Sequence, residues 1–310
     1  MFTKEDFVQM EEHGLTPAAL ETQLKNFREG FPFLPVTRAA SCGDGIRVLD
    51  AAGIEQAAAR YDRAKESLRV VKFVPASGAA TRMFKDLFEF VRAGRRTAVG
   101  GELLSNRRRC AFWPERRTIV GDDADELRTV ENIVAEGRRY GETPKGLVSF
   151  HRYGDEVRKA VEEHLVEGAQ YAAAGGEVKI HFTVSPEHLT RFEALLAEKI
   201  PGYESRFGVK YRISFSVQDP STDTLAVNPD CTPFRRADGR LLFRPAGHGA
   251  LIGNLGKIDA DIVFVKNIDN VTTDARRGDT VLYKKALDGV MLALQERNFE
   301  YIMALEVPGA

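Results

Sequence analysis

Short apolar runs that alternate with amphipathic segments are the feature that most constrains the fold of this chain. The strand-like runs occupy residues 69–74, 177–184, 209–217, 241–245 and 260–268. Helical patterns follow three of them, at residues 81–94, 188–200 and 281–298. The run at 260–268 is apolar on both faces, which is typical of a central parallel strand. Strands that alternate with helices predict an α/β fold with a mostly parallel central sheet.

The beginning of the chain has a helical pattern instead. Thr3 and Asp6 form a capping sequence before a first amphipathic helix. The last helical pattern of this region runs over residues 49–68. We therefore predict a helical N-terminal extension, residues 1–68, followed by an α/β domain at residues 69–310.

The composition limits the classes of function that fit. The chain has 310 residues, of which 43% are hydrophobic, so it can bury a sizeable core. Its 44 basic and 45 acidic residues leave a net charge of -1, which gives no global attraction for nucleic acid or an anionic membrane. The cysteines Cys42, Cys110 and Cys231 are far apart and contain no CxxC pair, as expected in a reducing compartment. No apolar run approaches the roughly 18 residues of a membrane span, and no secretion signal is present, so we predict a cytoplasmic protein.

The first candidate site is the loop of small residues after the first strand of the α/β domain. It reads Ala76-Ser77-Gly78-Ala79-Ala80, and the expected helix then holds Thr81 and Arg82 in its first turn. Free N–H groups at a helix N-terminus attract phosphate, small side chains let the ligand approach the backbone, and a guanidinium matches phosphate oxygens. The alternative is an ordinary tight turn with an arginine at its mouth.

Two further loops carry candidate ligand groups. Lys145 follows Pro144 in a short extended loop, where its ammonium could act as a point charge for phosphate or simply be a surface lysine. Gly247, His248 and Gly249 precede a helical segment, and this loop either lines a ligand or lets the histidine cap the turn.

Polar residues also follow two later strands. Asp269 lies at the carboxyl end of the most apolar strand, where ligands bind in open α/β sheets, and a carboxylate there could hold Mg²⁺ beside phosphates. The alternative is a turn that ends the strand, which Asp and Asn favour. Gln218 lies in a polar loop after residues 209–217 and is a weak candidate for reading a nucleobase.

Other chemical schemes find less support. No GxSxG elbow is present, and the histidines at 151, 164, 181 and 188 lack metal-binding spacing, which favours solvated or core-edge positions. The run Arg107–Arg109 with Phe112 and Trp113 could stack on nucleic acid. Because the run is short and the net charge is near zero, we favour a solvated insertion.

Taken in order, these motifs resemble those of nucleotidyltransferases that make nucleotide-sugars. Those enzymes carry a small-Gly-x-small-Thr-Arg-Leu/Met signature after their first strand, to which the stretch 75–83 is similar, and then a Pro-Lys pair like Pro144-Lys145. The stretch 245–249 resembles the Pro-Gly-His-Gly loop of UDP-sugar pyrophosphorylases, and 267–270 resembles their Asn-x-Asp-Asn. The whole chain also resembles a bacterial family, mostly from Bacteroidetes, whose function is unassigned.

The resemblance implies a GT-A-like, Rossmann-type fold and a specific reaction. A sugar-1-phosphate would attack the α-phosphorus of a nucleoside triphosphate, with UTP as the first guess, and pyrophosphate would leave. Such chemistry needs positioning and charge neutralisation. The implied roles are phosphate binding by Arg82 and the loop Ala76 to Thr81, transition-state stabilisation by Lys145, Mg²⁺ binding by Asp269, and base and ribose binding by Gln218, Gly247, His248 and Gly249.

The chain also departs from the pattern. Ser77 and Ala80 replace two glycines of the signature, and residues 93–141 would form an insertion. Only 41 residues follow Asp269, fewer than in the resembled enzymes, so a fragment or a short member is an open alternative. The second hypothesis for function is therefore a nucleotide- or sugar-phosphate-binding protein without transferase activity. The sugar, the base and the oligomeric state are not predicted.

Overall fold

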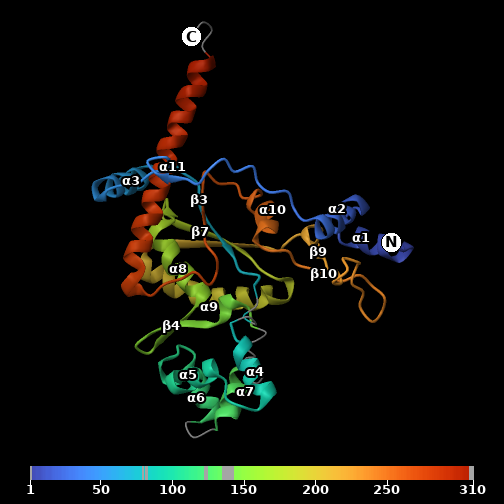
Figure 1. Cartoon of the computed structure of the whole chain (residues 1–310). Helices are drawn as coiled ribbons and strands as arrows, with labels where there is room; N and C mark the ends of the chain where they lie inside the picture. The colour runs from blue at the N-terminus through green and yellow to red at the C-terminus, as the bar shows by residue number, and fades with distance from the viewer. Residues whose placement is uncertain (1, 79, 81–82, 122–124, 135–142, 307–310) are drawn as a thin grey trace. The chain divides into compact units, whose positions relative to one another are not determined.

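The computed structural model describes residues 2–78, 80, 83–121, 125–134 and 143–306 (Figure 1). They form two compact units. Unit 1 joins Met1–Leu49 with Val217–Ile258, and unit 2 joins Asp50–Ser216 with Asp259–Ala310. The chain therefore passes between the units at three points, after Leu49, after Ser216 and after Ile258, whereas the predicted division has one boundary, after residue 68. Each unit is described by itself.

Unit 1 packs two helices on a small hairpin. The helices are α1 (Lys4–Glu12) and α2 (Pro17–Glu29), and the hairpin is β9 (Thr224–Leu225) with β10 (Phe243–Arg244). Unit 1 also contains a two-residue parallel pair, β1 (Ser41–Cys42) with β2 (Gly45–Ile46), and α10 (Ile252–Leu255). Its core is formed by Met10, Leu15, Leu20, Leu24, Leu225, Leu241 and Phe243.

Hydrogen bonds from α1 hold the hairpin of unit 1 in place. The amide of Gln9 donates to the carbonyl of Leu241 at 2.8 Å and accepts from its N–H at 3.0 Å, so both backbone groups are satisfied. The predicted capping box is confirmed, because the Thr3 hydroxyl accepts from the Asp6 N–H and the Asp6 carboxylate accepts from the Thr3 N–H.

The sheet of unit 2 is mixed, and its longer strands run parallel. The parallel order is β11 (Ile262–Val265), β3 (Val70–Pro75), β7 (Glu177–Thr183) and β8 (Lys210–Ser216), and β6 (Ala173–Ala174) pairs antiparallel with β7. The expectation that residues 260–268 form a central strand is wrong, because β11 pairs only with β3 among the described residues. Its pattern is apolar on both faces, yet Val265 is 46% exposed.

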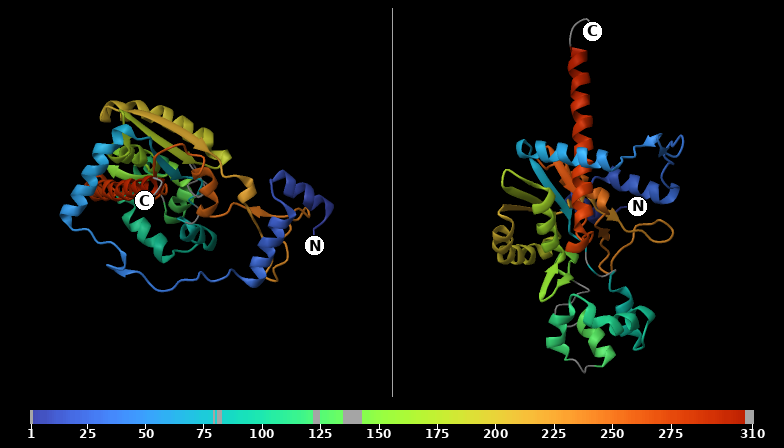
Figure 2. Two further views of the ribbon diagram at one scale, coloured as in Figure 1. Left: turned by 90° about the horizontal axis from the view of Figure 1, so that it is seen from above. Right: turned by 90° about the vertical axis from the view of Figure 1, so that its left-hand side faces the viewer.

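Helices pack on one face of this sheet. They are α3 (Ala51–Ala64), α8 (Ala160–Tyr171), α9 (Leu189–Phe207) and α11 (Arg277–Glu306), the last of which extends well beyond the sheet (Figures 1 and 2). One core cluster joins Leu165 and Phe192 of α8 and α9 to Phe182 of β7. Helix α8 comes close because Gly168 has no side chain: a Cβ there would lie 2.8 Å from Val178.

The expected insertion, residues 93–141, forms a packed group of helices with α4 (Lys85–Ala93), which precedes it. Its described elements are α5 (Ala98–Asn106), the single turn η3 (Arg107–Arg109), α6 (Trp113–Val120) and α7 (Glu126–Val134). Leu87, Phe90, Leu104, Phe112 and Ile133 form the core of this group. The expected solvated position holds for Arg108 and Arg109, which are exposed, but not for Phe112 and Trp113, which are buried. A hairpin of β4 (Ser149–Tyr153) and β5 (Glu156–Lys159) leads from the insertion into α8.

Candidate functional site

Three loops meet at the carboxyl ends of β3, β7 and β11. The Ala76 N–H donates to the carbonyl of Thr183 at 2.8 Å, directly after β3 and at the end of β7. The Lys145 N–H donates to the carbonyl of Gly78, and the Ile268 N–H donates to that of Pro75, each at 3.1 Å. Backbone hydrogen bonds therefore join the small-residue loop, the Pro-Lys-Gly loop and the turn after β11 within unit 2.

A lysine–carboxylate pair lies where these loops meet. The Nζ of Lys145 lies 2.5 Å from a carboxylate oxygen of Asp269, and the two side chains are 24% and 36% exposed. The turn that carries Asp269 closes with a hydrogen bond from the Asn270 N–H to the Asn267 carbonyl. The pair thus combines opposite charges, solvent access and a position at strand ends, where parallel sheets bind ligands.

The expected helix after the small-residue loop is α4, which begins at Lys85. The expectation that Thr81 and Arg82 occupy its first turn falls outside the described residues. Ala79 lies outside them as well. The Ala80 N–H donates to the carbonyl of Thr143 at 3.1 Å.

The two departures from the glycine signature fit this loop. Ser77, Gly78 and Ala80 all lack a positive φ, so none of the three needs the conformational freedom of glycine. Ala80 is completely buried in the core of the insertion, and Ser77 accepts a hydrogen bond through its carbonyl from the Ser185 hydroxyl at 3.1 Å. A side chain on Gly78 would meet open space, which leaves this part of the loop accessible to a ligand.

Gly146 sets the position of Lys145 by packing. A Cβ on Gly146 would lie 2.6 Å from the ring of Phe192 and 3.2 Å from Ile268. The loop can therefore lie flat against helix α9 and the turn after β11 only because this residue has no side chain. Its φ is not positive, so the requirement is one of space.

The remaining predicted residues belong to unit 1. The amide of Gln218 donates to the Thr222 hydroxyl at 3.2 Å, inside its own loop. Gly247 precedes a single turn, η7 (His248–Leu251), and its carbonyl accepts from the Ala250 N–H. Gly247 and Gly249 both lack a positive φ, and a Cβ added to either would have no neighbour within 4 Å. The conformation and the described packing of this loop therefore do not require glycine at these positions.

A buried ion cluster on α8 and the neighbouring strands was missed by sequence reasoning. The Glu167 carboxylate is 3.0 Å from the Nζ of Lys72 and 2.7 Å from that of Lys266, and Glu167 is completely buried. Burial opposes ionisation of Glu167, but the charges of Lys72 and Lys266 and the hydrogen bond from Lys266 outweigh it and lower its pKa to about 2. The sequence did contain a signal for this cluster, because each of two apolar strand-like runs, 69–74 and 260–268, includes one lysine, Lys72 and Lys266.

His164 connects this ion cluster to the loop of Asp269. It is completely buried, contrary to the expected solvated or core-edge position, and its Nε2–H donates to the carbonyl of Ile268 at 3.1 Å. Burial and the charge of Lys72 hold the pKa of His164 well below its usual value, so the ring is neutral. Its Nδ1 has no partner among the described residues. The ring therefore holds the residue before Asp269.

A second buried carboxylate organises the hairpin before α8. Glu163 accepts a hydrogen bond from the Tyr153 hydroxyl at 2.7 Å, lies 2.9 Å from the Nδ1 of His151, and pairs with Arg277. Arg158, also buried, pairs with Asp274 at 2.8 Å. All of these charges have protein partners, which indicates a structural role.

Asp269 has the chemistry that a magnesium ion would require. Mg²⁺ is commonly held by one or two carboxylates together with substrate phosphates, and a half-exposed carboxylate at a strand end suits this mode. No group of three or more His, Cys, Asp or Glu side chains able to hold a metal occurs among the described residues. A magnesium ion at Asp269 therefore stays a prediction from the sequence.

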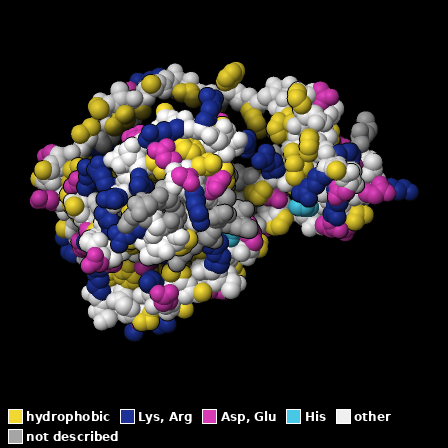
Figure 3. Space-filling model, turned by 90° about the horizontal axis from the view of Figure 1, so that it is seen from below, with side chains coloured by type: hydrophobic (Ala, Val, Ile, Leu, Met, Phe, Trp, Pro, Cys, Tyr) yellow, Lys and Arg dark blue, Asp and Glu magenta, His cyan; other side chains and the backbone are white. Residues whose placement is uncertain are grey.

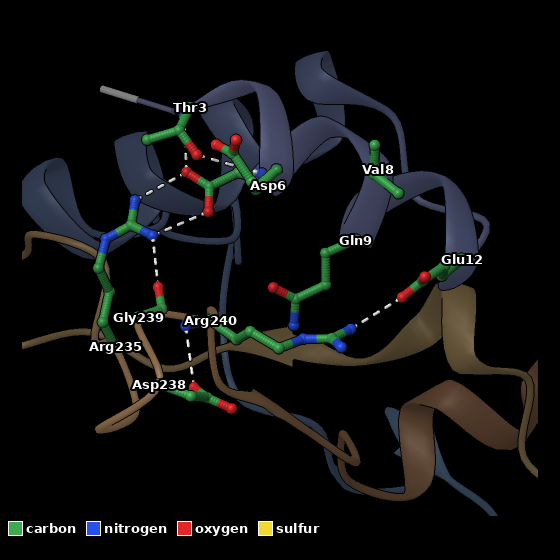
Figure 4. Close-up of a pocket in the computed structure, with 10 residues that line it drawn as sticks. Thr3, Asp6, Val8, Gln9, Glu12, Arg235, Asp238, Gly239 and Arg240 are labelled. Atoms are coloured by element: carbon green, nitrogen blue, oxygen red, sulfur yellow. Dashed lines mark hydrogen bonds and ion pairs between the residues drawn. The ribbon is translucent and has the colours of Figure 1, made fainter.

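Unit 1 contains a hollow of about 560 Å³ between α1 and the loop before β10 (Figure 4). Its principal charges are paired: Arg235 binds Asp6 through two hydrogen bonds of 2.8 and 2.7 Å, and Arg240 binds Glu12 at 2.8 Å. The nearby strands β9 and β10 are antiparallel, so the hollow lacks the parallel strand ends at which α/β sheets bind ligands, and the strand-end site of unit 2 remains the better candidate for chemistry.

The comparisons with known proteins identify the family. Residues 3–309 match the model of a domain of unknown function, DUF4301, so the chain belongs to this family. No curated protein and no solved structure matches the chain significantly. Among the described residues, no helix has both the length and the apolar character to cross a membrane.

Proposed function

We propose that this protein is a sugar nucleotidyltransferase, which joins a nucleoside triphosphate to a sugar-1-phosphate and releases pyrophosphate. The observation that supports it most is the Lys145–Asp269 pair beside the small-residue loop, at the carboxyl ends of parallel strands. These are the residues that the resemblance to UDP-sugar pyrophosphorylases assigns to the reacting phosphates. The proposal also includes a more specific fold than the α/β architecture described above, namely a GT-A-like, Rossmann-type fold.

The reaction needs charge neutralisation more than acid–base chemistry. A phosphate oxygen of the sugar-1-phosphate forms a bond to the α-phosphorus, and the bond between that phosphorus and the oxygen bridging to the β-phosphate breaks. Lys145 binds the α-phosphoryl oxygens, where negative charge develops in the transition state. To do so, its ammonium exchanges one anionic partner, Asp269, for another.

The site would assemble around the triphosphate. Asp269 holds Mg²⁺, which neutralises phosphate charge when bound. Gly78 offers an unobstructed stretch of backbone beside the phosphates, and Arg82 contributes a guanidinium. The resemblance also assigns Gln218, Gly247, His248 and Gly249 to the base and ribose; these residues belong to unit 1, and that role stays a prediction from sequence. UTP, a cytoplasmic location and the absence of a nucleic-acid partner remain predictions from sequence.

A binding and turnover assay tests this proposal. Mg-UTP raises the melting temperature of the full chain, because a ligand that binds only the native state stabilises it. Pyrophosphate is then released when sugar-1-phosphates are added one at a time. Binding without release by any of them would favour the alternative, a nucleotide- or sugar-phosphate-binding protein.

Variants separate the role of Lys145 from its contribution to folding. Lys145→Ala lowers the rate of pyrophosphate release by about a hundredfold or more, since one charged donor to the developing anion is lost. The matched control is Lys210→Ala, an exposed lysine of the same unit that is paired with Glu204. Full activity of Lys145→Ala would remove the proposed site.

A further inference from the structure

The helical insertion contains a hollow lined by arginines. It has a volume of about 360 Å³, and its described lining consists of Arg108, Trp113, Pro114, Arg117 and Arg152. The three guanidinium groups come from η3, α6 and β4, so distant parts of the sequence bring them together. Figure 3 views the molecule from below, towards this insertion, and shows Lys and Arg side chains at several places on that face.

These arginines differ from other arginines of unit 2. Arg158, Arg212 and Arg277 each have a carboxylate partner. By contrast, no acidic side chain is among the described residues that line the hollow. None of its three guanidinium groups forms an ion pair with a described carboxylate. Like charges gathered around one hollow repel one another, and a bound anion would reduce this cost.

The tryptophan in the hollow is held firmly and has an unused donor. Trp113 is 4% exposed, and the guanidinium of Arg107 lies 5.3 Å from the centre of its ring. The indole Nε1 is buried and has no hydrogen-bond partner among the described residues. A buried N–H without an acceptor is unfavourable, so an added acceptor at this indole would be stabilising.

We propose that this hollow binds a small phosphate-bearing molecule. Guanidinium groups match phosphate oxygens in geometry and charge, and three of them around one hollow suit a multiply charged anion. Nucleic acid fits less well. Proteins bind its bases on exposed aromatic rings, whereas Phe112 and Trp113 are 8% and 4% exposed.

The site is separate in its residues from the proposed nucleotide site. It shares no residue with the pair Lys145–Asp269, and it includes a side chain of the β4–β5 hairpin. A bound anion would tie β4 to α6 through Arg152 and Arg117. The hollow therefore adds a second phosphate-binding position to the protein, whatever reaction takes place at the strand ends.

The fluorescence of Trp113 reports on this hollow directly, because the chain contains only one tryptophan. The full chain is titrated with inorganic phosphate, pyrophosphate and a sugar phosphate in separate experiments. We expect a saturable change in indole emission. Tighter binding of the sugar phosphate than of the two inorganic anions would identify an organic phosphate as the ligand. If inorganic phosphate or pyrophosphate binds as tightly as the sugar phosphate, the ligand is a free phosphate.

Variants test whether the signal comes from the arginines. Arg117→Ala and Arg152→Ala each weaken the binding by about tenfold or more, as the loss of one charge-assisted hydrogen bond predicts. Arg212→Ala, an exposed arginine elsewhere in unit 2, and Lys145→Ala keep the wild-type response. Retained binding by Lys145→Ala separates this site from the proposed nucleotide site, and unchanged melting temperatures show that the variants fold.

Several results would overturn this proposal. The first is no saturable change with any of the three anions. The second is an unchanged affinity in both arginine variants, and the third is loss of the response in Lys145→Ala, which would place the anion at the strand-end site. A response limited to single-stranded oligonucleotides, with affinity rising with length, would identify a nucleic-acid surface instead.

Discussion

Two lysine–carboxylate groupings of unit 2 use the same chemistry in opposite surroundings. The buried grouping consists of Glu167 with Lys72 and Lys266, and its carboxylate has no exposure. The exposed grouping is Lys145 with Asp269, whose side chains are 24% and 36% exposed. The buried one joins α8 to β3 and to the residue after β11, whereas the exposed one closes a site at the strand ends.

The difference between these groupings assigns each a role. Removing one member of a buried ion group leaves an uncompensated charge in a medium that solvates it poorly, so such a group holds the fold. Water screens an exposed pair, which contributes little to stability and can exchange its partner for a ligand. Burial therefore separates the structural lysines from the lysine available for chemistry.

The largest expected effect is on the buried grouping. Glu167→Gln leaves Lys72 and Lys266 without their anion, and we expect the free energy of unfolding to fall by about 3–5 kcal/mol. Chemical denaturation at neutral pH measures this loss. A loss below about 1 kcal/mol would show that the buried grouping behaves like the exposed one.

A second prediction concerns pH and extends the buried grouping to Asp288 of α11. Burial raises the pKa of Asp288 to about 7, and the charge of Lys284 opposes this effect. The folded state then keeps a proton that the unfolded state has lost, so this residue lowers stability as pH rises from about 4 to about 7. Asp288→Asn should remove that slope and raise the free energy of unfolding at pH 8 by roughly 2–4 kcal/mol. Parallel stability–pH profiles of the two proteins would contradict this expectation.

The third prediction addresses the loop beneath the exposed pair. Gly146→Ala places a methyl group 2.6 Å from the ring of Phe192, and relieving this clash should cost about 1–3 kcal/mol. Thermal unfolding measures the loss. Phe192→Leu removes the ring that the new methyl group meets. Gly146→Ala should therefore cost less stability when it is added to Phe192→Leu than when it is added to the wild-type protein. Gly78→Ala, which meets open space, is the matched control.

The smallest expected effect on stability is at the exposed pair itself. Asp269→Asn should change the free energy of unfolding by less than about 1 kcal/mol, because the pair is half-exposed. The same variant should lose most of the rise in melting temperature with Mg-UTP. A large loss of stability together with an unchanged nucleotide response would reverse the roles of the two groupings.

Local patterns predicted the parts of the fold that depend on neighbouring residues. The strands β3, β7 and β8 follow from apolar runs, and the cap of α1 follows from Thr3 and Asp6. The resemblance assigned both Lys145 and Asp269 to the reacting phosphates, and the structure places their side chains in contact. The chemical roles of these two residues stay predictions.

Other expectations failed where long-range contacts decide the structure. In the loop before α4, Gly78 and Ala80 form backbone hydrogen bonds with Lys145 and Thr143, which are distant in the chain. Strand β11 lies at the edge of the described sheet, although its apolar pattern suggested a central position. Periodicity reports which side chains prefer burial, but it does not report which element covers them.

The sequence by itself determined the periodic elements, the helix caps and the order of the loops that carry Lys145 and Asp269. Only the tertiary structure decided which charges are buried together, because Glu167 meets Lys72 and Lys266 from positions 95 and 99 residues away. It also decided that Arg108, Arg117 and Arg152 share one hollow. Charge interactions depend on distance and burial in space, and these two quantities exist only once the chain has folded.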